Sequence, residues 1–197
     1  MGESRLDKSD VIRELLDSLS IEDTERARQL IQDRYPHVPV DRASRTFSEI
    51  ECMRVFKRDG FIDLYSHDRQ RLVFPGTLRL ISILLPKEFP FQAHWKMGDC
   101  HIAYWELFPT VDHVQPIARG GPNVESNWVT TSQLRNSAKA NWTLDELGWK
   151  RHQAGDFEEW DGLTGWFVEF VDAHRELLQQ HNYVKVWYRA ARICLGS

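Results

Sequence analysis

The segment Val111–Gly121 (VDHVQPIARGG) decides the fold, together with Asn127 and the segment Asn136–Lys139 (NSAK) that follow it. An Asp-His pair stands at the expected end of a strand, and a proline and a Gly-Gly pair come shortly after it. Successive strand residues point to opposite sides, so Asp112 and His113 can serve one site only if the strand ends or bends here. Proline and glycine are the residues that make such a bend.

The residue types in this stretch are those that phosphodiester hydrolysis needs. A phosphodiester is anionic and repels hydroxide, so the attacking water must lose its proton beside the phosphate. His113 can accept that proton, because an imidazole titrates near neutral pH. Asp112 and Asn136 offer a carboxylate and an amide oxygen, both hard ligands that suit Mg²⁺ or another divalent ion such as Mn²⁺. Two protein ligands are enough, because Mg²⁺ keeps several waters and takes a phosphate oxygen from its substrate.

These residues resemble the HNH endonuclease motif, in a variant that reads Asp-His, Asn and then Asn-x-x-Lys. The resemblance extends over roughly residues 55–140, and it implies a ββα-metal core made of two strands and a helix. It further implies that His113 is the general base, that Asp112 and Asn136 are the metal ligands, and that Asn127 braces the loop carrying the histidine. The implied substrate is DNA.

The chain departs from the family at the positions of its structural zinc. Many members carry two Cys-x-x-Cys pairs that bind Zn²⁺. By position, the first pair falls at Asp63 and Ser66, and the second at Ser132 and Arg135. The three cysteines present are Cys52, Cys100 and Cys194. Their spacing gives no ligand pair, so we expect no structural zinc and a core held by ordinary burial.

Composition indicates a single globular domain, or one domain with helical extensions. The chain has 197 residues, and a hydrophobic content of 42% supports a sizeable core. Three cysteines without a pairing pattern indicate a reducing compartment. No apolar run reaches transmembrane length, and the charged N-terminus predicts no secretory signal. We therefore expect a cytoplasmic protein without a membrane segment, and the sequence leaves its oligomeric state open.

The distribution of charge bears on DNA as a partner. The formal net charge is −4, which argues mildly against a nucleic-acid binder, but residues 40–80 are locally basic and residues 155–180 strongly acidic. The predicted phosphate contacts are Lys139, Arg119, Arg58 and Arg71. For Lys139 and Arg119 an ordinary solvent-exposed position is an equal alternative. The eight tryptophans are scattered along the chain, which favours a role in the core over a base-stacking surface.

The expected elements fall into three parts. The N-terminal extension, residues 1–46, has helices at 8–19 and 21–34. The nuclease core, residues 47–150, has a helix at 47–58, strands at 61–65 and 71–74, a helix at 77–85, hairpin strands at 102–108 and 111–115, and a helix at 131–140. The C-terminal extension, residues 151–197, has helices at 163–180 and 182–194 and packs on the core.

The sequence thus predicts an α+β protein whose ββα-metal nuclease core is flanked by N- and C-terminal helices. The predicted function is hydrolysis of DNA phosphodiester bonds by a metal-dependent endonuclease, with a histidine that activates water. The alternative is a catalytically inactive module of the same fold that binds nucleic acid or protein. The intact Asp-His-Asn-Asn set favours the enzyme, because a binding module has no chemical need for His113.

Overall fold

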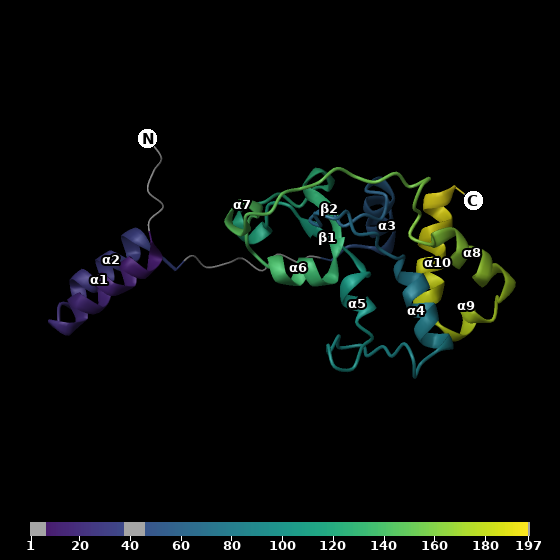
Figure 1. Cartoon of the computed structure of the whole chain (residues 1–197), viewed down its shortest axis with the longest axis horizontal. Helices are drawn as coiled ribbons and strands as arrows, with labels where there is room; N and C mark the ends of the chain where they lie inside the picture. The colour runs from purple at the N-terminus through teal and green to yellow at the C-terminus, as the bar shows by residue number, and fades with distance from the viewer. Residues whose placement is uncertain (1–6, 38–45, 197) are drawn as a thin grey trace. The chain divides into compact units, whose positions relative to one another are not determined.

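Figure 1 shows the fold in a computed structural model, which describes residues 7–37 and 46–196. The chain divides into two units, Met1–Asp41 and Arg42–Ser197. Helices dominate the described residues, and two strands form one antiparallel sheet, which confirms the α+β class. Within the same ranges, we find no helix with the length and apolar character needed to cross a bilayer.

The first unit is a helical hairpin of α1 (Lys8–Ser20) and α2 (Thr24–Arg34). Each helix begins behind an aspartate whose carboxylate accepts a backbone N–H of the first turn, Asp7 for α1 and Asp23 for α2. Such caps satisfy amide groups that have no partner inside the helix. The two helices lie where the apolar spacing predicts helices.

The second unit is built on a core of packed helices. These are α3 (Glu49–Arg58), α4 (Pro75–Leu84), α8 (Thr164–Ala173), α9 (Leu177–Gln180) and α10 (Asn182–Leu195). Helix α10 packs against the other four, and α3 packs in addition against both strands. Large aromatic side chains fill this core, among them Phe56, Phe74, Phe167 and Trp187. The C-terminal helices therefore share one core with the helix that supports the sheet (Figure 1).

The sheet and the helix after it form one continuous unit. Strand β1 (Pro109–His113) pairs antiparallel with β2 (Trp128–Ser132), so that His113 lies opposite Trp128. Helix α6 (Gln133–Lys139) begins directly after β2 and packs against both strands. Ser132 is at once the last strand residue and the cap of α6, because its hydroxyl accepts the backbone N–H of Arg135 at 3.3 Å. The chain order is thus strand, strand, helix.

The predicted first strand of the hairpin, residues 102–108, is wrong. This segment contains the short helix α5 (Ala103–Glu106), which buries Ala103 and Tyr104. Tyr104 packs in a cluster with Leu78 and Cys100, so burial of one helical side decides the local structure. The partner of β1 instead follows it, beyond a long loop that holds the 3₁₀ turns η1 (Ile117–Arg119) and η2 (Glu125–Asn127).

Two other element predictions differ from the structure. The predicted strands at 61–65 and 71–74 amount to a single bridge between Ile62 and Arg71. The chain turns at once after Ile62, because the carboxylate of Asp63 accepts the backbone N–H of Tyr65 at 3.0 Å. The predicted helix at 163–180 is interrupted between α8 and α9. A further short helix, α7 (Leu144–Leu147), lies between α6 and α8 in the chain.

Candidate functional site

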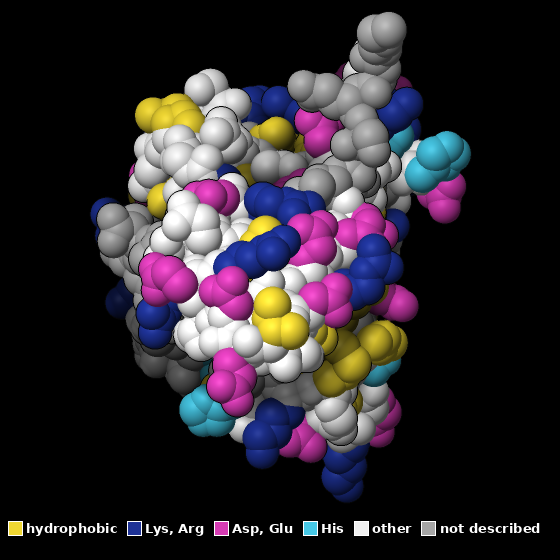
Figure 2. Space-filling view, turned by 90° about the vertical axis from the view of Figure 1, so that its left-hand side faces the viewer, with side chains coloured by type: hydrophobic (Ala, Val, Ile, Leu, Met, Phe, Trp, Pro, Cys, Tyr) yellow, Lys and Arg dark blue, Asp and Glu magenta, His cyan; other side chains and the backbone are white. Residues whose placement is uncertain are grey.

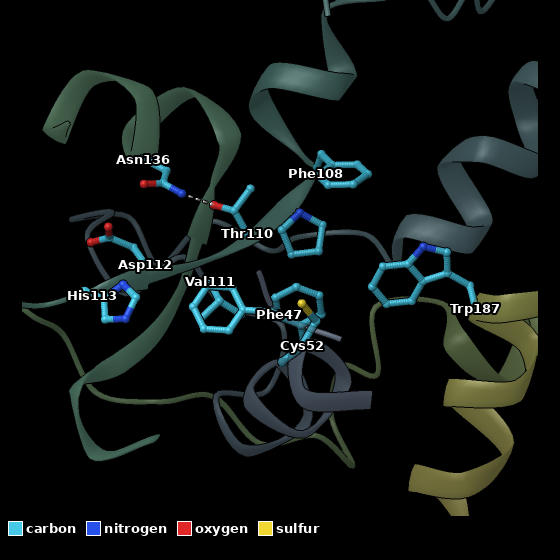
Figure 3. A pocket seen from close by; sticks show the side chains of 11 residues that line it. Phe47, Cys52, Phe108, Thr110, Val111, Asp112, His113, Asn136 and Trp187 are labelled. Atoms are coloured by element: carbon cyan, nitrogen blue, oxygen red, sulfur yellow. Dashed lines mark hydrogen bonds between the residues drawn. The ribbon is translucent and has the colours of Figure 1, made fainter. Parts of the chain in front are cut away.

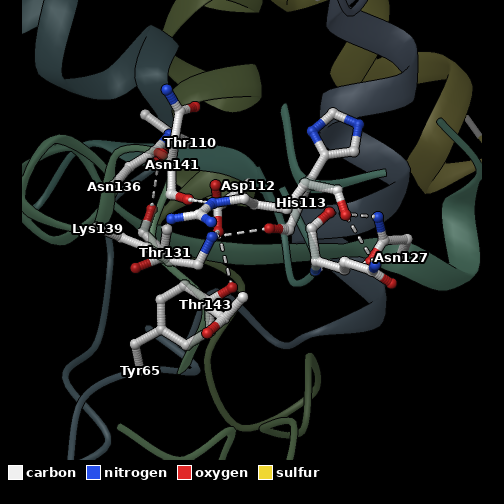
Figure 4. Close-up of polar contacts among 12 residues, drawn as sticks. Tyr65, Thr110, Asp112, His113, Asn127, Thr131, Asn136, Lys139, Asn141 and Thr143 are labelled. Carbon is white, nitrogen blue, oxygen red and sulfur yellow. Dashed lines mark hydrogen bonds and ion pairs between the residues drawn. The ribbon is translucent and has the colours of Figure 1, made fainter. Parts of the chain in front are cut away.

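The loop after β1 is held by the side chain of Asn127. Its amide oxygen accepts the backbone N–H of Gln115 at 2.9 Å, and its amide nitrogen donates to the carbonyls of Gln115 and Pro122, both at 2.9 Å. These three hydrogen bonds tie the two ends of the loop together, and Figure 4 shows Asn127 near His113. A Cβ at Gly121 would lie 1.9 Å from the Gln115 carbonyl oxygen, so the loop can close only with glycine there.

Asp112 lies in a buried polar cluster with Tyr65 and Lys139. Its Oδ2 accepts the Tyr65 hydroxyl at 2.7 Å and lies 2.9 Å from Lys139 Nζ, which also donates to the backbone carbonyl of His113 at 2.8 Å (Figure 4). Burial, and then the negative charge of Asp112, raise the pKa of the Tyr65 phenol above its ordinary value. The phenol therefore keeps its proton and acts as a donor to the carboxylate.

The burial of Lys139 gives this residue a different role from the predicted one. Its side chain has 0% exposure and its ammonium group is paired with Asp112, so it offers no surface to a phosphate in this conformation. Asn136 and Lys139 do lie on one side of α6, as their spacing indicates, but that side faces the sheet. Lys139 thus binds the carboxylate of Asp112 and the backbone carbonyl of His113, the last residue of β1.

Asn136 presents its amide oxygen to the same side of the strand as Asp112. Thr110 and Asp112 are two residues apart in β1, so their side chains share one side, which faces α6. The Thr110 hydroxyl donates to the carbonyl of Thr131 at 3.1 Å, so its oxygen can only accept from Asn136, at 3.0 Å. The Asn136 nitrogen is therefore occupied and its oxygen is available, next to the Asp112 carboxylate in Figure 3.

His113 points to the other side of β1, towards α3. Its ring lies 5.6 Å from the ring of Phe47, and its Nε2 lies 2.9 Å from the amide oxygen of Asn123. The indole N–H of Trp128 reaches the same oxygen at 3.2 Å. The same indole N–H also lies 3.1 Å from Nε2, so Asn123 and Trp128 together hold this ring nitrogen.

One pocket of about 330 Å³ connects the two sides of the strand. All five residues of β1 line it, because it follows the strand edge that is not paired with β2. Asp112, His113 and Asn136 are among the lining residues (Figure 3). Asp112 and His113 point to opposite sides of β1, but both side chains line this pocket, because it passes around the edge of the strand. It thus brings together the predicted base and both predicted metal ligands.

The donor set around this pocket fits a hard divalent cation. Asp112 and Asn136 supply one carboxylate and one amide oxygen, and both side chains line the pocket. Within residues 7–37 and 46–196, no three His, Cys, Asp or Glu side chains gather as a metal cluster. An ion held here would depend on water and substrate oxygens for its other contacts, which is usual for Mg²⁺.

The predicted arginine contacts lie outside the pocket. Arg58 binds the carboxylate of Asp59 at 2.8 Å and the carbonyl of Trp128 at 2.7 Å, so it fastens α3 to β2. Arg119 donates to the carbonyl of Asn141 at 3.3 Å, and Arg71 lies over the ring of Trp160. On the face shown in Figure 2, Lys and Arg side chains are interspersed with Asp and Glu. Arg58, Arg71 and Arg119 are thus engaged in contacts elsewhere, and none of them lines the pocket.

The positions aligned with the family's zinc ligands are in contact with one another. Asp63 has 0% exposure, and its carboxylate accepts the backbone N–H of Ser132 at 3.1 Å and the guanidinium of Arg135 at 3.3 Å. The Thr131 hydroxyl donates to the same carboxylate at 2.8 Å. A carboxylate with several donors thus joins the segment before the hairpin to the start of α6.

Sequence reasoning missed four contributors to the site: Tyr65, Thr110, Asn123 and Trp128. Thr110 lay just outside the expected strand 111–115, but it stands two residues before Asp112, and it shares a side with Asp112 because β1 begins at Pro109. Tyr65 had no such signal, since only the folded chain brings it to Asp112.

The chain matches no protein-family model, no curated protein sequence and no solved structure.

Proposed function

We propose that this protein is a metal-dependent endonuclease of the HNH type that hydrolyses DNA phosphodiester bonds. The observation that carries the proposal is the pocket along the free edge of β1, which Asp112, His113 and Asn136 line together. The contacts of Asn127 support it, because they hold the loop that follows the histidine. The contact between Asp63 and Arg135 supports a core that needs no structural zinc.

Each residue has a role that its contacts allow. His113 takes a proton from the attacking water, whose oxygen bonds to phosphorus while the bond to the 3′ oxygen breaks. The leaving oxygen gains a proton from solvent, and a divalent ion, when bound, supplies positive charge to offset the charge that develops there. Asp112 and Asn136 would hold that ion through their oxygens. Tyr65 and Lys139 orient the carboxylate.

The ion pair with Lys139 makes binding of the metal dependent on the substrate. A cation near Asp112 is repelled by the ammonium of Lys139, and at 4 Å two unit charges interact by about 4 kcal/mol at an effective dielectric constant of about 20. A bound phosphate adds negative charge that offsets this repulsion. We therefore expect weak affinity for Mg²⁺ alone and stronger affinity when DNA is present.

Cleavage of plasmid DNA tests the proposal directly. The purified protein is incubated with supercoiled plasmid in Mg²⁺, in Mn²⁺ and in excess EDTA. Cleavage in the divalent ions and none in EDTA is expected, and His113→Ala should lower the rate by roughly 10²–10⁴-fold. His67→Ala is the matched control, because its side chain is 94% exposed and lies outside the pocket. Equal rates in His113→Ala and wild type would refute the role of the base.

The alternative is a catalytically inactive module that binds nucleic acid or protein. The observation in its favour is that Lys139 already neutralises Asp112. This alternative predicts that the protein binds an oligonucleotide or a partner but leaves plasmid intact in every divalent ion. The same incubation, with binding measured in parallel, separates the two functions.

A further inference from the structure

The pocket continues from the candidate site into an aromatic half. At one end lie Asp112, His113 and Asn136, the ring of Phe47 lies 5.6 Å from that of His113, and towards the other end lie Phe108 and Trp187 (Figure 3). Cys52, Phe56, Pro109 and Val111 complete the apolar lining. The volume of about 330 Å³ is at the lower end of the range of small-molecule sites, about 300–1,000 Å³. It exceeds the space of an ordinary packing defect in a protein core.

The described side chains that line the aromatic half carry no formal charge. Cys52 is the titratable one among them, and burial raises the pKa of that thiol to about 12, so it stays neutral. Within residues 7–37 and 46–196, no lysine or arginine lines the pocket. Neutralisation of phosphates by these lining residues therefore contributes little, and an interaction of another kind is needed to hold a nucleic-acid substrate against them.

We propose that this aromatic half receives the unpaired base of a nucleotide next to the cleaved phosphate, so that the substrate is single-stranded or locally unpaired DNA. This inference rests on the proposed nuclease function and names its substrate class. Aromatic side chains bind bases by stacking, whatever the sequence, because every base has a π face. A base within an intact duplex cannot enter such a pocket unless it leaves the stack.

The position of the pocket along β1 supports this assignment. The carboxylate of Asp112 and the amide of Asn136 are at one end, Phe108 and Trp187 are at the other, and Phe47 is beside His113. One nucleotide can therefore place its phosphate at the polar end while its base meets these rings. A nucleotide uses both ends, because its phosphate meets the polar side chains and its base stacks on the rings.

A series of abasic oligonucleotides tests the inference. Fluorescent single-stranded DNA molecules, each with one abasic nucleotide at a different position, are bound to the full chain in Ca²⁺ and followed by anisotropy. Loss of the base at one position should weaken binding roughly tenfold, the scale of one stacked base, and the other positions should have little effect. Intact duplex of the same sequence should bind more weakly than the single strand.

Variants of two pocket residues test whether the base that contributes to affinity binds in this pocket. Phe47→Leu and Phe108→Leu remove a half-buried ring but keep an apolar side chain, and each should reduce the difference between base and abasic nucleotide. Phe91→Leu is the matched control, because Phe91 is a half-buried aromatic residue outside the pocket. Thermal melting of each variant checks its folding, and the abasic series on the wild-type protein needs no variant.

The outcomes separate this inference from the nuclease proposal. A position-specific abasic effect without any cleavage would keep the base pocket and refute the nuclease. Cleavage that depends on His113, with equal affinity at every abasic position, would keep the nuclease and refute the base pocket. Absence of binding to any single strand would overturn the inference as well.

Discussion

Lys139 Nζ lies 2.9 Å from Asp112 Oδ2, and neither side chain is more than 9% exposed. The ion pair joins the last residue of α6 to the strand that carries the candidate base, and the same ammonium also binds the carbonyl of His113. A buried pair of this kind is weak evidence for net stability, but the loss of one partner leaves a charge without compensation. The pair therefore specifies where α6 sits on β1.

Lys139→Met should lower the free energy of unfolding by about 3–5 kcal/mol, because it leaves the buried carboxylate of Asp112 unpaired. Addition of Asp112→Asn should recover much of that loss, since the remaining group is neutral. Urea denaturation measures both effects. Lys185→Met, at an exposed position of α10, serves as the control. A change of under about 1 kcal/mol in Lys139→Met would contradict the description of a buried ion pair.

Tyr65→Phe should raise the Mg²⁺ concentration needed for half-maximal cleavage, because Asp112 loses the donor that orients it. A hydrogen bond to a charged acceptor contributes about 1.5–3 kcal/mol, so stability should fall by a similar amount. Tyr188→Phe is the control, since that hydroxyl donates to Asp172, whose carboxylate does not line the pocket. Unchanged metal dependence in Tyr65→Phe would exclude a positioning role.

The raised pKa of Tyr65 also predicts a dependence of stability on pH. The folded state favours the protonated phenol, and the unfolded phenol titrates near pH 10. The contribution is therefore complete below about pH 10 and is lost as the pH rises above that value. Wild type should lose stability between about pH 9 and 11 more steeply than Tyr65→Phe. Parallel curves for the two proteins would show that Tyr65 is not the group involved.

Asn127→Ala should loosen the loop between β1 and β2, because it removes three hydrogen bonds, each worth about 1 kcal/mol. Hydrogen exchange of the loop amides should accelerate while the amides of α10 stay protected. Cleavage should fall, since the histidine precedes the loop. Asn182→Ala, at an exposed position, is the control. Unchanged exchange in the loop would contradict the bracing role.

Replacement of Asp63, Ser66, Ser132 and Arg135 by cysteine should create a zinc site, because the two segments are already in contact. One Zn²⁺ per chain is expected by elemental analysis, with a melting temperature that falls on chelation. Asp63→Asn alone should destabilise the protein, since the carboxylate loses its charge-assisted contacts. Absence of zinc from a folded quadruple variant would show that these positions do not have ligand geometry.

The sequence predicts the helices well where local signals define them. The apolar spacing at 47–58 and the capping box of Ser48 and Glu51 act within a few residues, and α3 lies there. The partner of β1 could not be predicted in the same way. Strand β2 lies beyond a long loop, and the local pattern of β1 does not indicate which distant segment pairs with it. The segment 102–108 has a pattern that fits a strand or a buried helical turn equally.

The candidate residues of the site were predictable as residue types, and their surroundings were not. The spacing of Asn136 and Lys139 gives a shared side of a helix, but only the sheet packed against that side makes Lys139 buried. The contact of Tyr65 with Asp112 joins residues 47 apart in sequence, so no local pattern could indicate it. The pocket along β1 likewise depends on Trp187 from the far end of the chain.

The direct passage from β2 into α6 couples the register of the strand to the rotation of the helix. No residue separates Ser132 from Gln133, so any slip of the strand must be transmitted to the helix as a rotation. A shift of one residue turns an α-helix by about 100°. Such a turn would carry Asn136 away from Asp112 and expose Lys139. Insertion or deletion of a single residue in β2 would therefore undo the alignment of the whole site, although both elements could still form.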